Sequence, residues 1–133
     1  MKNFADRLVR RIAELDNPTV MGLDPKLDYI PAHLIEEAKA EFPDDREKAT
    51  AHAIWLFNKA LIDAVYDIVP AIKPQFAYYE LYGIEALKVL DKTVKYAQEK
   101  GLETAAWTVD IPVFSDILSL FGIKYITTNR IYP

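Results

Sequence analysis

Short apolar segments alternate with helical segments along this chain, and this alternation restricts the possible folds more than any other feature. Apolar runs predict four strands, at residues 19–23, 69–75, 104–109 and 125–128. Apolar residues at helical spacing predict five helices, at residues 4–15, 32–42, 47–67, 84–100 and 113–121. Strands separated by helices pair in parallel through right-handed crossovers. We therefore predict an α/β fold, a parallel (βα) half-barrel of about four strands derived from the eight-stranded TIM barrel.

Capping residues set several of the predicted boundaries. Asn3 is expected to cap the first helix, and Gly101 and Gly122 stand where a left-handed residue ends a helix. The segment 76–83, "FAYYELYG", is interpreted as a loop.

Barrels of this type carry their sites at the carboxyl ends of the strands, so Asp24 and Lys73 become candidate site residues.

Composition and charge exclude several classes of protein. The 133 residues include 20 acids and 16 bases, for a net charge of -4, and no basic run suited to nucleic acid is present. No apolar run reaches the ~20 residues that cross a bilayer, and cysteine is absent, so we expect one soluble, cytoplasmic domain over residues 1–133 that does not bind a membrane. His33 and His52 are the only imidazoles, and their spacing does not suit a metal site, so neither metal nor cofactor is expected.

Five motifs in the first hundred residues occur in order at compatible spacing: "FADRL", "VMGLDPKLD", "LFNKALIDAV", "VPAIKPQFAYYELYGIEALK" and "TVKYAQEKGL". Together they resemble the N-terminal part of bacterial orotidine 5'-phosphate decarboxylase. The resemblance implies a (βα)8 barrel that decarboxylates a pyrimidine nucleotide without metal or organic cofactor. It also implies that Asp24 and Lys73 occupy the first two positions of an alternating Asp and Lys network. The family's third strand, of the form DAKRGDI, does not follow.

A second resemblance begins after Gly101. The segments "AAWTVDIPVF" and "LFGIKYITTNR" are similar to the C-terminal strands of glycerophosphodiester phosphodiesterases. That family's catalytic residues, an HRG motif with acidic metal ligands and a further His, do not occur in this sequence. We therefore hypothesise a chimera, in which residues 1–101 form a decarboxylase-like βαβα segment and residues 102–133 form a phosphodiesterase-like βαβ segment of the same domain.

The candidate site residues each have a structural interpretation beside the functional one. Asp24 and Lys73 are either a retained catalytic pair or a vestigial ion pair at a sheet end, and the missing third strand favours the ion pair. Gln75, Trp107 and Arg130 are candidate substrate-binding residues, although Trp107 suits an interface and Arg130 suits a solvated terminus. Asp110 is interpreted as an N-cap for the helix that follows it rather than as a catalytic acid.

Two functional hypotheses follow from these interpretations. In the first, the chain is a chimeric or engineered half-barrel without a complete active site, which self-associates as a homodimer or higher oligomer to cover its open sheet. In the second, it is an orotidine 5'-phosphate decarboxylase-like carboxy-lyase of pyrimidine biosynthesis, with a site completed by a second chain and a nucleotide monophosphate as ligand. A nucleotide-binding module without chemistry would need a phosphate-binding loop, which is missing.

Overall fold

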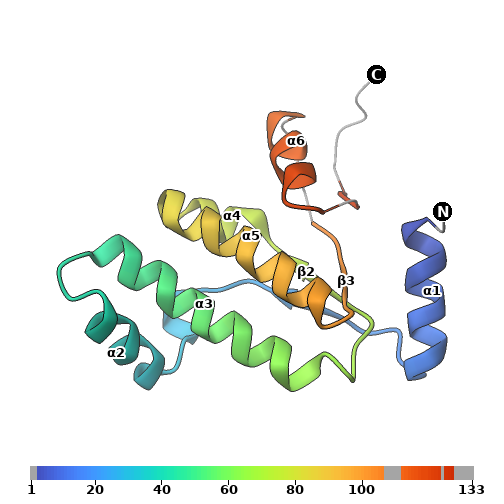
Figure 1. Cartoon of the computed structure of the whole chain (residues 1–133), viewed down its shortest axis with the longest axis horizontal. Coiled ribbons are helices and arrows are strands. Elements are labelled where there is room, and N and C mark those ends of the chain that lie inside the picture. Colours follow the sequence, from blue (N-terminus) through green and yellow to red (C-terminus); the bar gives the residue numbers. More distant parts are fainter. Residues whose placement is uncertain (1–2, 107–111, 124, 128–133) are drawn as a thin grey trace.

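The computed structural model describes residues 3–106, 112–123 and 125–127 (Figure 1). Its helices and strands alternate as predicted. In chain order the elements are α1 (Phe4–Leu15), β1 (Val20–Leu23), the short 3-10 helix η1 (Leu27–Tyr29), α2 (Ala32–Glu41), α3 (Arg46–Val65), β2 (Ala71–Pro74), α4 (Phe76–Glu80), α5 (Gly83–Glu99), β3 (Glu103–Thr104) and α6 (Pro112–Leu120).

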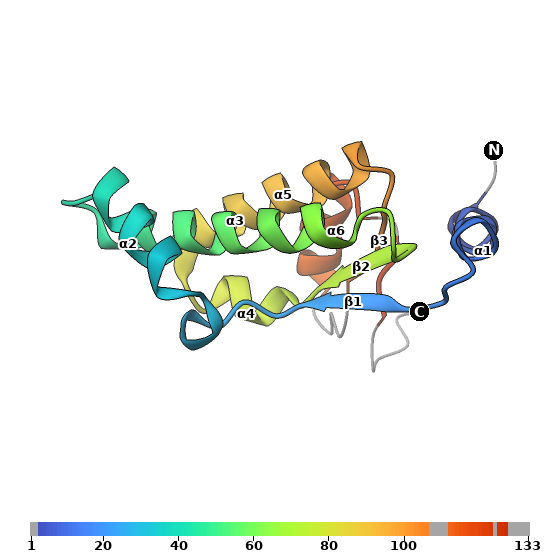
Figure 2. The same ribbon diagram turned by 90° about the horizontal axis from the view of Figure 1, so that it is seen from below.

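The three strands form one parallel sheet in the order β1-β2-β3, which confirms the predicted fold class. Gly22 of β1 lies opposite Lys73 of β2, and Ala71 of β2 lies opposite Glu103 of β3. Helices α3 and α5 lie side by side on one face of this sheet, whereas the described helices leave most of the other face uncovered (Figure 2). The arrangement is that of a segment of a (βα) barrel, with the helical layer outside and the open face inside.

The later strands are shorter than the sequence predicts. β3 consists of Glu103, which precedes the predicted strand, and Thr104, which is its first residue, and Ala106 makes a single parallel bridge to Ile126 where a fourth strand was expected. Residues 107–109 and 128, which complete the two predicted strands, lie outside the described residues. Within the described ranges, the fourth position of the sheet is therefore one bridge rather than a ladder.

The predicted loop at residues 76–83 is wrong, because this segment contains α4 and the first residue of α5. Phe76 and Tyr79 are one helical turn apart and both are buried, so a single turn of helix places both rings in the core. A five-residue helix lacks the repeated spacing from which helices are predicted. Its stability comes from tertiary contacts rather than from its own sequence.

The caps predicted at Asn3, Gly101 and Gly122 are confirmed. The Asn3 side chain accepts a hydrogen bond from the Asp6 amide at 2.9 Å and begins α1. Gly101 and Gly122 have φ angles of 84° and 85°, in the left-handed region that favours glycine. These two turns reverse the chain after α5 and α6, which lets each following segment run back along the sheet.

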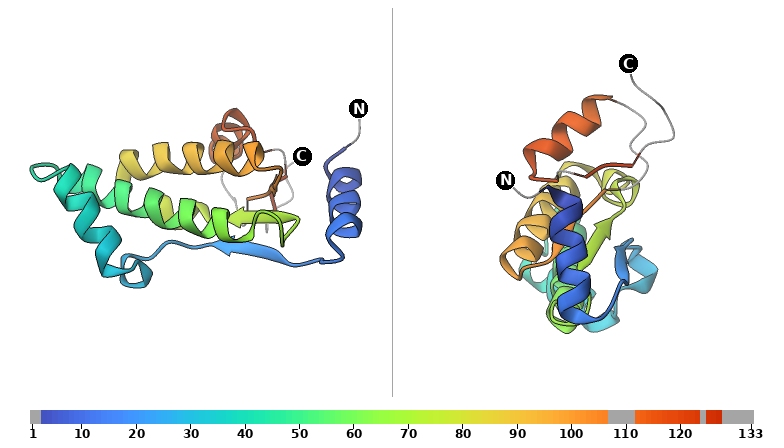
Figure 3. Two further views of the ribbon diagram at one scale, coloured as in Figure 1. Left: turned by 60° about the horizontal axis from the view of Figure 1, so that its bottom comes forward. Right: turned by 90° about the vertical axis from the view of Figure 1, so that its right-hand side faces the viewer.

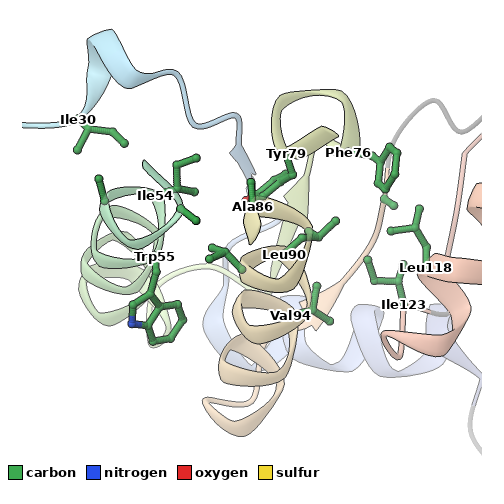
Figure 4. Packing of buried hydrophobic residues seen from close by; sticks show 14 of the residues in the cluster. Ile30, Ile54, Trp55, Phe76, Tyr79, Ala86, Leu90, Val94, Leu118 and Ile123 are labelled. Carbon is green, nitrogen blue, oxygen red and sulfur yellow. The ribbon is translucent and has the colours of Figure 1, made fainter. Parts of the chain in front are cut away.

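The buried apolar residues form two clusters. The larger cluster lies between α3, α4, α5 and the end of α6, and includes Ile54, Tyr79, Leu90, Leu118 and Ile123 (Figure 4). The smaller one joins the sheet to its covering helices, and its members are Leu23, Ile62, Val69, Ile72, Ala97 and Leu102. The strands bury one side under the helices and turn the other side, which includes Val20 and Lys73, toward the inner face.

Helix α1 stands beyond the end of the sheet (Figure 3). Its Arg7 guanidinium makes two hydrogen bonds of 2.9 Å to the Glu103 carboxylate of β3. This contact raises the pKa of Arg7, with the hydrogen bond as the main cause. The Phe4 ring stacks on Tyr125 with the ring centroids 4.7 Å apart. These contacts tie the two ends of the chain to each other.

A second electrostatic network joins α3 to α5. Asp63 accepts hydrogen bonds from Lys59, at 2.7 Å, and from the Tyr96 hydroxyl, and Lys100 lies 3.3 Å away. These three partners, led by Lys59 and Tyr96, lower the pKa of Asp63 to about 2.

Within the described ranges, no helix is long and apolar enough to cross a membrane.

We expect Leu90→Ala to destabilise the protein by about 2–5 kcal/mol, because it deletes a fully buried side chain and leaves a cavity between α3 and α5. Leu120→Ala is the matched control, since the Leu120 side chain is 83% exposed at the end of α6. It should change the free energy of unfolding by less than about 0.5 kcal/mol. Urea denaturation measures the free energy of unfolding of both variants. Equal losses of stability in the two variants would contradict the assigned core.

Asp63→Asn should make the protein less stable at neutral pH but not in strong acid. Because the folded pKa is lowered to about 2 from an ordinary value of 3.8, the carboxylate stabilises the fold above the ordinary value. That contribution is lost as the pH falls through the folded pKa. Thermal melts from pH 7 to pH 2 should show the two proteins converging below about pH 4. Asp44→Asn, at an exposed acid between α2 and α3, controls for the loss of one charge. A difference in melting temperature between wild type and Asp63→Asn that stays constant from pH 7 to pH 2 would contradict the lowered pKa of Asp63.

Candidate active site

The candidate site lies at the carboxyl ends of β1 and β2. Lys73 is opposite Gly22 in the parallel register, and Asp24 follows Gly22 by two residues. Side chains two apart on a strand share a face, so Asp24 and Lys73 project from the same face of the sheet. A Cβ atom added at Gly22 would lie 3.8 Å from both Asp24 carboxylate oxygens, which shows that this carboxylate lies over the glycine.

The two charged residues share a face but differ in exposure. Asp24 is exposed and Lys73 is half-buried. The Asp24 carboxylate is therefore accessible to solvent, as a group that meets a substrate must be. Whether either residue is catalytic stays a prediction.

An apolar cavity of about 240 Å³ adjoins Lys73 on the inner face, between α1 and the sheet. Its walls are made by apolar and hydroxyl side chains and by Lys73, and its lining residues are Phe4, Leu8, Val20, Ala71, Lys73, Ala105, Ala106, Tyr125 and Thr127. Electrostatic interactions are stronger in apolar surroundings than in water. An ammonium group at this wall is thus well placed to act on a negative charge at the strand ends.

Gln75 lies at the same end of the sheet. Its backbone N–H donates to the Leu23 carbonyl at 3.1 Å, which extends the β1-β2 ladder to the residue before Asp24. The sequence-predicted site residues Asp24, Lys73 and Gln75 are therefore brought together by two adjacent strands. Trp107 and Arg130, together with Asp110, lie outside the described residues, and their roles stay predictions.

Sequence reasoning missed a polar group beneath this end of the sheet. Asn58 of α3 is fully buried, and its Nδ2 donates to the Tyr79 hydroxyl at 2.9 Å and to the Thr93 hydroxyl at 3.1 Å. Burial raises the pKa of Tyr79, and the negative charge of Asp24 raises it further, so the phenol stays protonated. A signal was available in the sequence, because Asn58 interrupts an apolar stripe between Ile54 and Ile62 at intervals of four.

The described residues contain no group of three or more His, Asp or Glu side chains that could hold a metal ion. His33 is exposed on α2, and His52 of α3 packs edge-on against Phe42 with the ring centroids 5.4 Å apart. The chemistry available at the described strand ends is therefore that of a carboxylate and an ammonium group.

This arrangement, parallel strands under helices with charged residues at the strand ends, is of the TIM-barrel type. No protein-family model matches the chain. Sequence comparison finds orotidine 5'-phosphate decarboxylases: that of Petrotoga mobilis is 43% identical over 91 residues, 68% of this chain and 28% of that protein. That of Clostridium perfringens strain SM101 is 36% identical over 98 residues, 74% of this chain and 31% of that protein. The chain thus contains an orotidine 5'-phosphate decarboxylase-like segment.

Solved structures give the same fold. A putative orotidine-monophosphate decarboxylase from Toxoplasma gondii matches 96% of this chain and 40% of its own chain, with a TM-score of 0.72 and 21% identity. A putative orotidine 5'-phosphate decarboxylase from Streptomyces avermitilis matches 90% of this chain and 38% of its own, with a TM-score of 0.62 and 23% identity. In each of these four comparisons the chain spans 40% or less of the protein that it resembles.

Proposed function

We propose that this chain supplies the first part of an orotidine 5'-phosphate decarboxylase-like site, which a second polypeptide chain completes. The observation that carries the proposal is the placement of Asp24 and Lys73 on one face at the carboxyl ends of adjacent parallel strands. The substrate under this proposal is a pyrimidine nucleotide monophosphate that carries a carboxylate. Sequence similarity to named decarboxylases supports it.

The charges suit the two halves of such a reaction. A carboxylate such as Asp24 beside the substrate carboxylate disfavours the ground state by repulsion. When the bond to the carboxylate breaks, carbon dioxide leaves and the electron pair stays on the ring carbon. The Lys73 ammonium group stabilises this negative charge and then donates its proton to the carbon. The family's pattern contains four such charged positions and this chain matches two, so the remaining charges must come from elsewhere.

One further match favours the decarboxylase hypothesis over a chimera. The orotidine 5'-phosphate decarboxylase of Caldicellulosiruptor saccharolyticus is 28% identical over an alignment of 150 residues that takes in 97% of this chain and 48% of that protein. An alignment of this extent includes most of the segment after Gly101. The similarity of residues 102–133 to phosphodiesterases, and a junction near Gly101, remain hypotheses that this match does not require.

The chain alone should not decarboxylate orotidine 5'-phosphate, and addition of the missing part should restore activity. The complementing probe is a polypeptide that carries the rest of the Petrotoga mobilis barrel, beyond the part that matches this chain. Loss of orotidine absorbance measures the reaction. Lys73→Ala should reduce the restored activity by at least about a hundredfold, because it removes the proton donor.

Lys39→Ala is the matched control, since this exposed lysine lies on α2 and pairs with Glu36. It should leave the restored activity unchanged. Asp24→Asn tests the second charge and should lower the rate constant. The proposal fails if the complemented wild type is inactive although the two polypeptides bind each other, or if Lys73→Ala has full activity.

Self-association is a second candidate function, favoured by the open sheet. The described helices cover one face of the sheet (Figure 2), and Val20 and Tyr125, which line the cavity beside Lys73, are 44% and 47% exposed. The outer edge of β1 is also unpaired within the described sheet. Exposed parallel strands and apolar surface favour pairing with another copy. We propose that, without a complementing chain, this inner face is covered by a second copy in a twofold dimer.

Sedimentation equilibrium should give twice the chain mass at micromolar concentration. Val20→Lys should shift the equilibrium toward monomer, because it places a charge on the inner face beside the β1 edge. Val9→Lys is the control: Val9 is 64% exposed on α1 and the substitution adds the same charge. A folded monomer up to millimolar concentration, or equal effects of the two substitutions, would exclude a dimer formed through the inner face.

A further inference from the structure

We infer that Asn58, Tyr79 and Thr93 form a positioning triad, which holds α4 so that the residues on either side of the candidate site stay in register. The three side chains come from three different helices, α3, α4 and α5, and all three are fully buried. The catalytic consequence of the inference rests on the proposed function. Its structural content does not.

The amide of Asn58 is the centre of the triad. Its Nδ2 carries two N–H donors, and these two donors reach the Tyr79 and Thr93 hydroxyl oxygens at 2.9 Å and 3.1 Å. One residue of α3 thereby fixes both α4 and α5. Hydrogen bonds have preferred distances and directions, whereas apolar contacts do not, so this link determines the position of α4 and not only its burial.

Helix α4 in turn contacts the loops that follow both strands. It begins directly after Gln75, whose N–H donates to the Leu23 carbonyl at 3.1 Å. Just beyond its other end, the Tyr82 hydroxyl accepts a hydrogen bond from the Leu27 N–H at 3.4 Å, in the loop after Asp24. A shift of α4 would therefore move the segments that carry Lys73 and Asp24 together.

The triad is poorly suited to a purely stabilising role. Within the described part of the chain, the buried Asn58 Oδ1 has no hydrogen-bond partner. An unsatisfied buried acceptor opposes folding, and apolar residues of similar shape at all three positions would avoid that cost. The hydrogen bonds that Asn58 does make define the position of α4.

The experiment uses a triple variant, Asn58→Leu, Tyr79→Phe and Thr93→Val, which replaces the hydrogen bonds with apolar contacts. Amide hydrogen exchange, measured by NMR on the full chain, follows two matched hydrogen bonds at opposite ends of β2. The test amide is Gln75, which donates to Leu23, and the control is Glu103, which donates to the Pro70 carbonyl at 3.0 Å. Thermal melting reports the global stability.

We expect the triple variant to melt at the wild-type temperature or above, while the Gln75 amide exchanges about tenfold faster and the Glu103 amide does not change. A merely stabilising triad would instead lower the melting temperature and accelerate both amides together. That result, or unchanged protection of Gln75, overturns the inference. If the triple variant does not fold, Tyr79→Phe alone removes one hydroxyl, and the same selective loss at Gln75 is expected or the inference fails.

The hydrogen-exchange and melting results do not depend on decarboxylation. Failure of this inference is therefore distinguishable from failure of the proposed function. In the complemented protein, the triple variant should lower the catalytic rate constant more than it lowers affinity for uridine 5'-monophosphate. Loss of activity with unchanged Gln75 exchange would show that the triad does not act through α4, and would count against the inference even if the decarboxylase proposal holds.

Discussion

The parallel pairing of β1 with β2 is the interaction on which the rest of the structure depends. Parallel neighbours cannot be joined by a tight turn, so the chain between them must cross over as a helix, and α2 and α3 occupy that connection. The same pairing buries Leu23 and Ile72 beneath the helices and turns Asp24 and Lys73 to the opposite face. A slip of one residue would exchange the core and site positions of the slipped strand. The apolar cluster thus also fixes where the charged groups stand.

The sequence predicts the elements whose pattern is long, and fails where the pattern is short. Helices α1, α3 and α5 repeat apolar residues over several turns, and their caps are local, so their bounds agree with the structure within about two residues. Helix α4 has one turn, and tertiary burial of Phe76 and Tyr79 decides its conformation. For the site, strand ends predict the meeting of Asp24, Lys73 and Gln75. The partners of Asn58 come from residues 21 and 35 positions away, and no local pattern encodes such a contact.

Under the decarboxylase proposal, the open inner face and the match to two of the family's four charged positions have one explanation. A barrel encloses its inner face only when the sheet closes, and the strands described here are a three-stranded part of such a sheet. The same closure brings charged residues from distant strands to one substrate. A chain that contains the first strands therefore has two of the charges and an uncovered apolar face at once. Under the two proposals, a complementing chain and a second copy of this chain compete for the same face.

That competition gives α4 a particular importance. In a closed barrel the neighbouring strands on both sides restrain the loops after β1 and β2, whereas here the β1 side is a free edge within the described sheet. These loops must then be restrained by contacts with the helical layer. The hydrogen bonds from Asn58 to Tyr79 and from Leu27 to Tyr82 lie on that route, and both use a tyrosine hydroxyl, one in α4 and one just beyond its end. A part of a barrel can hold its share of a site in order only if its own helices do this. Among the described residues, the buried amide of Asn58 links α4 to the helical layer in this way.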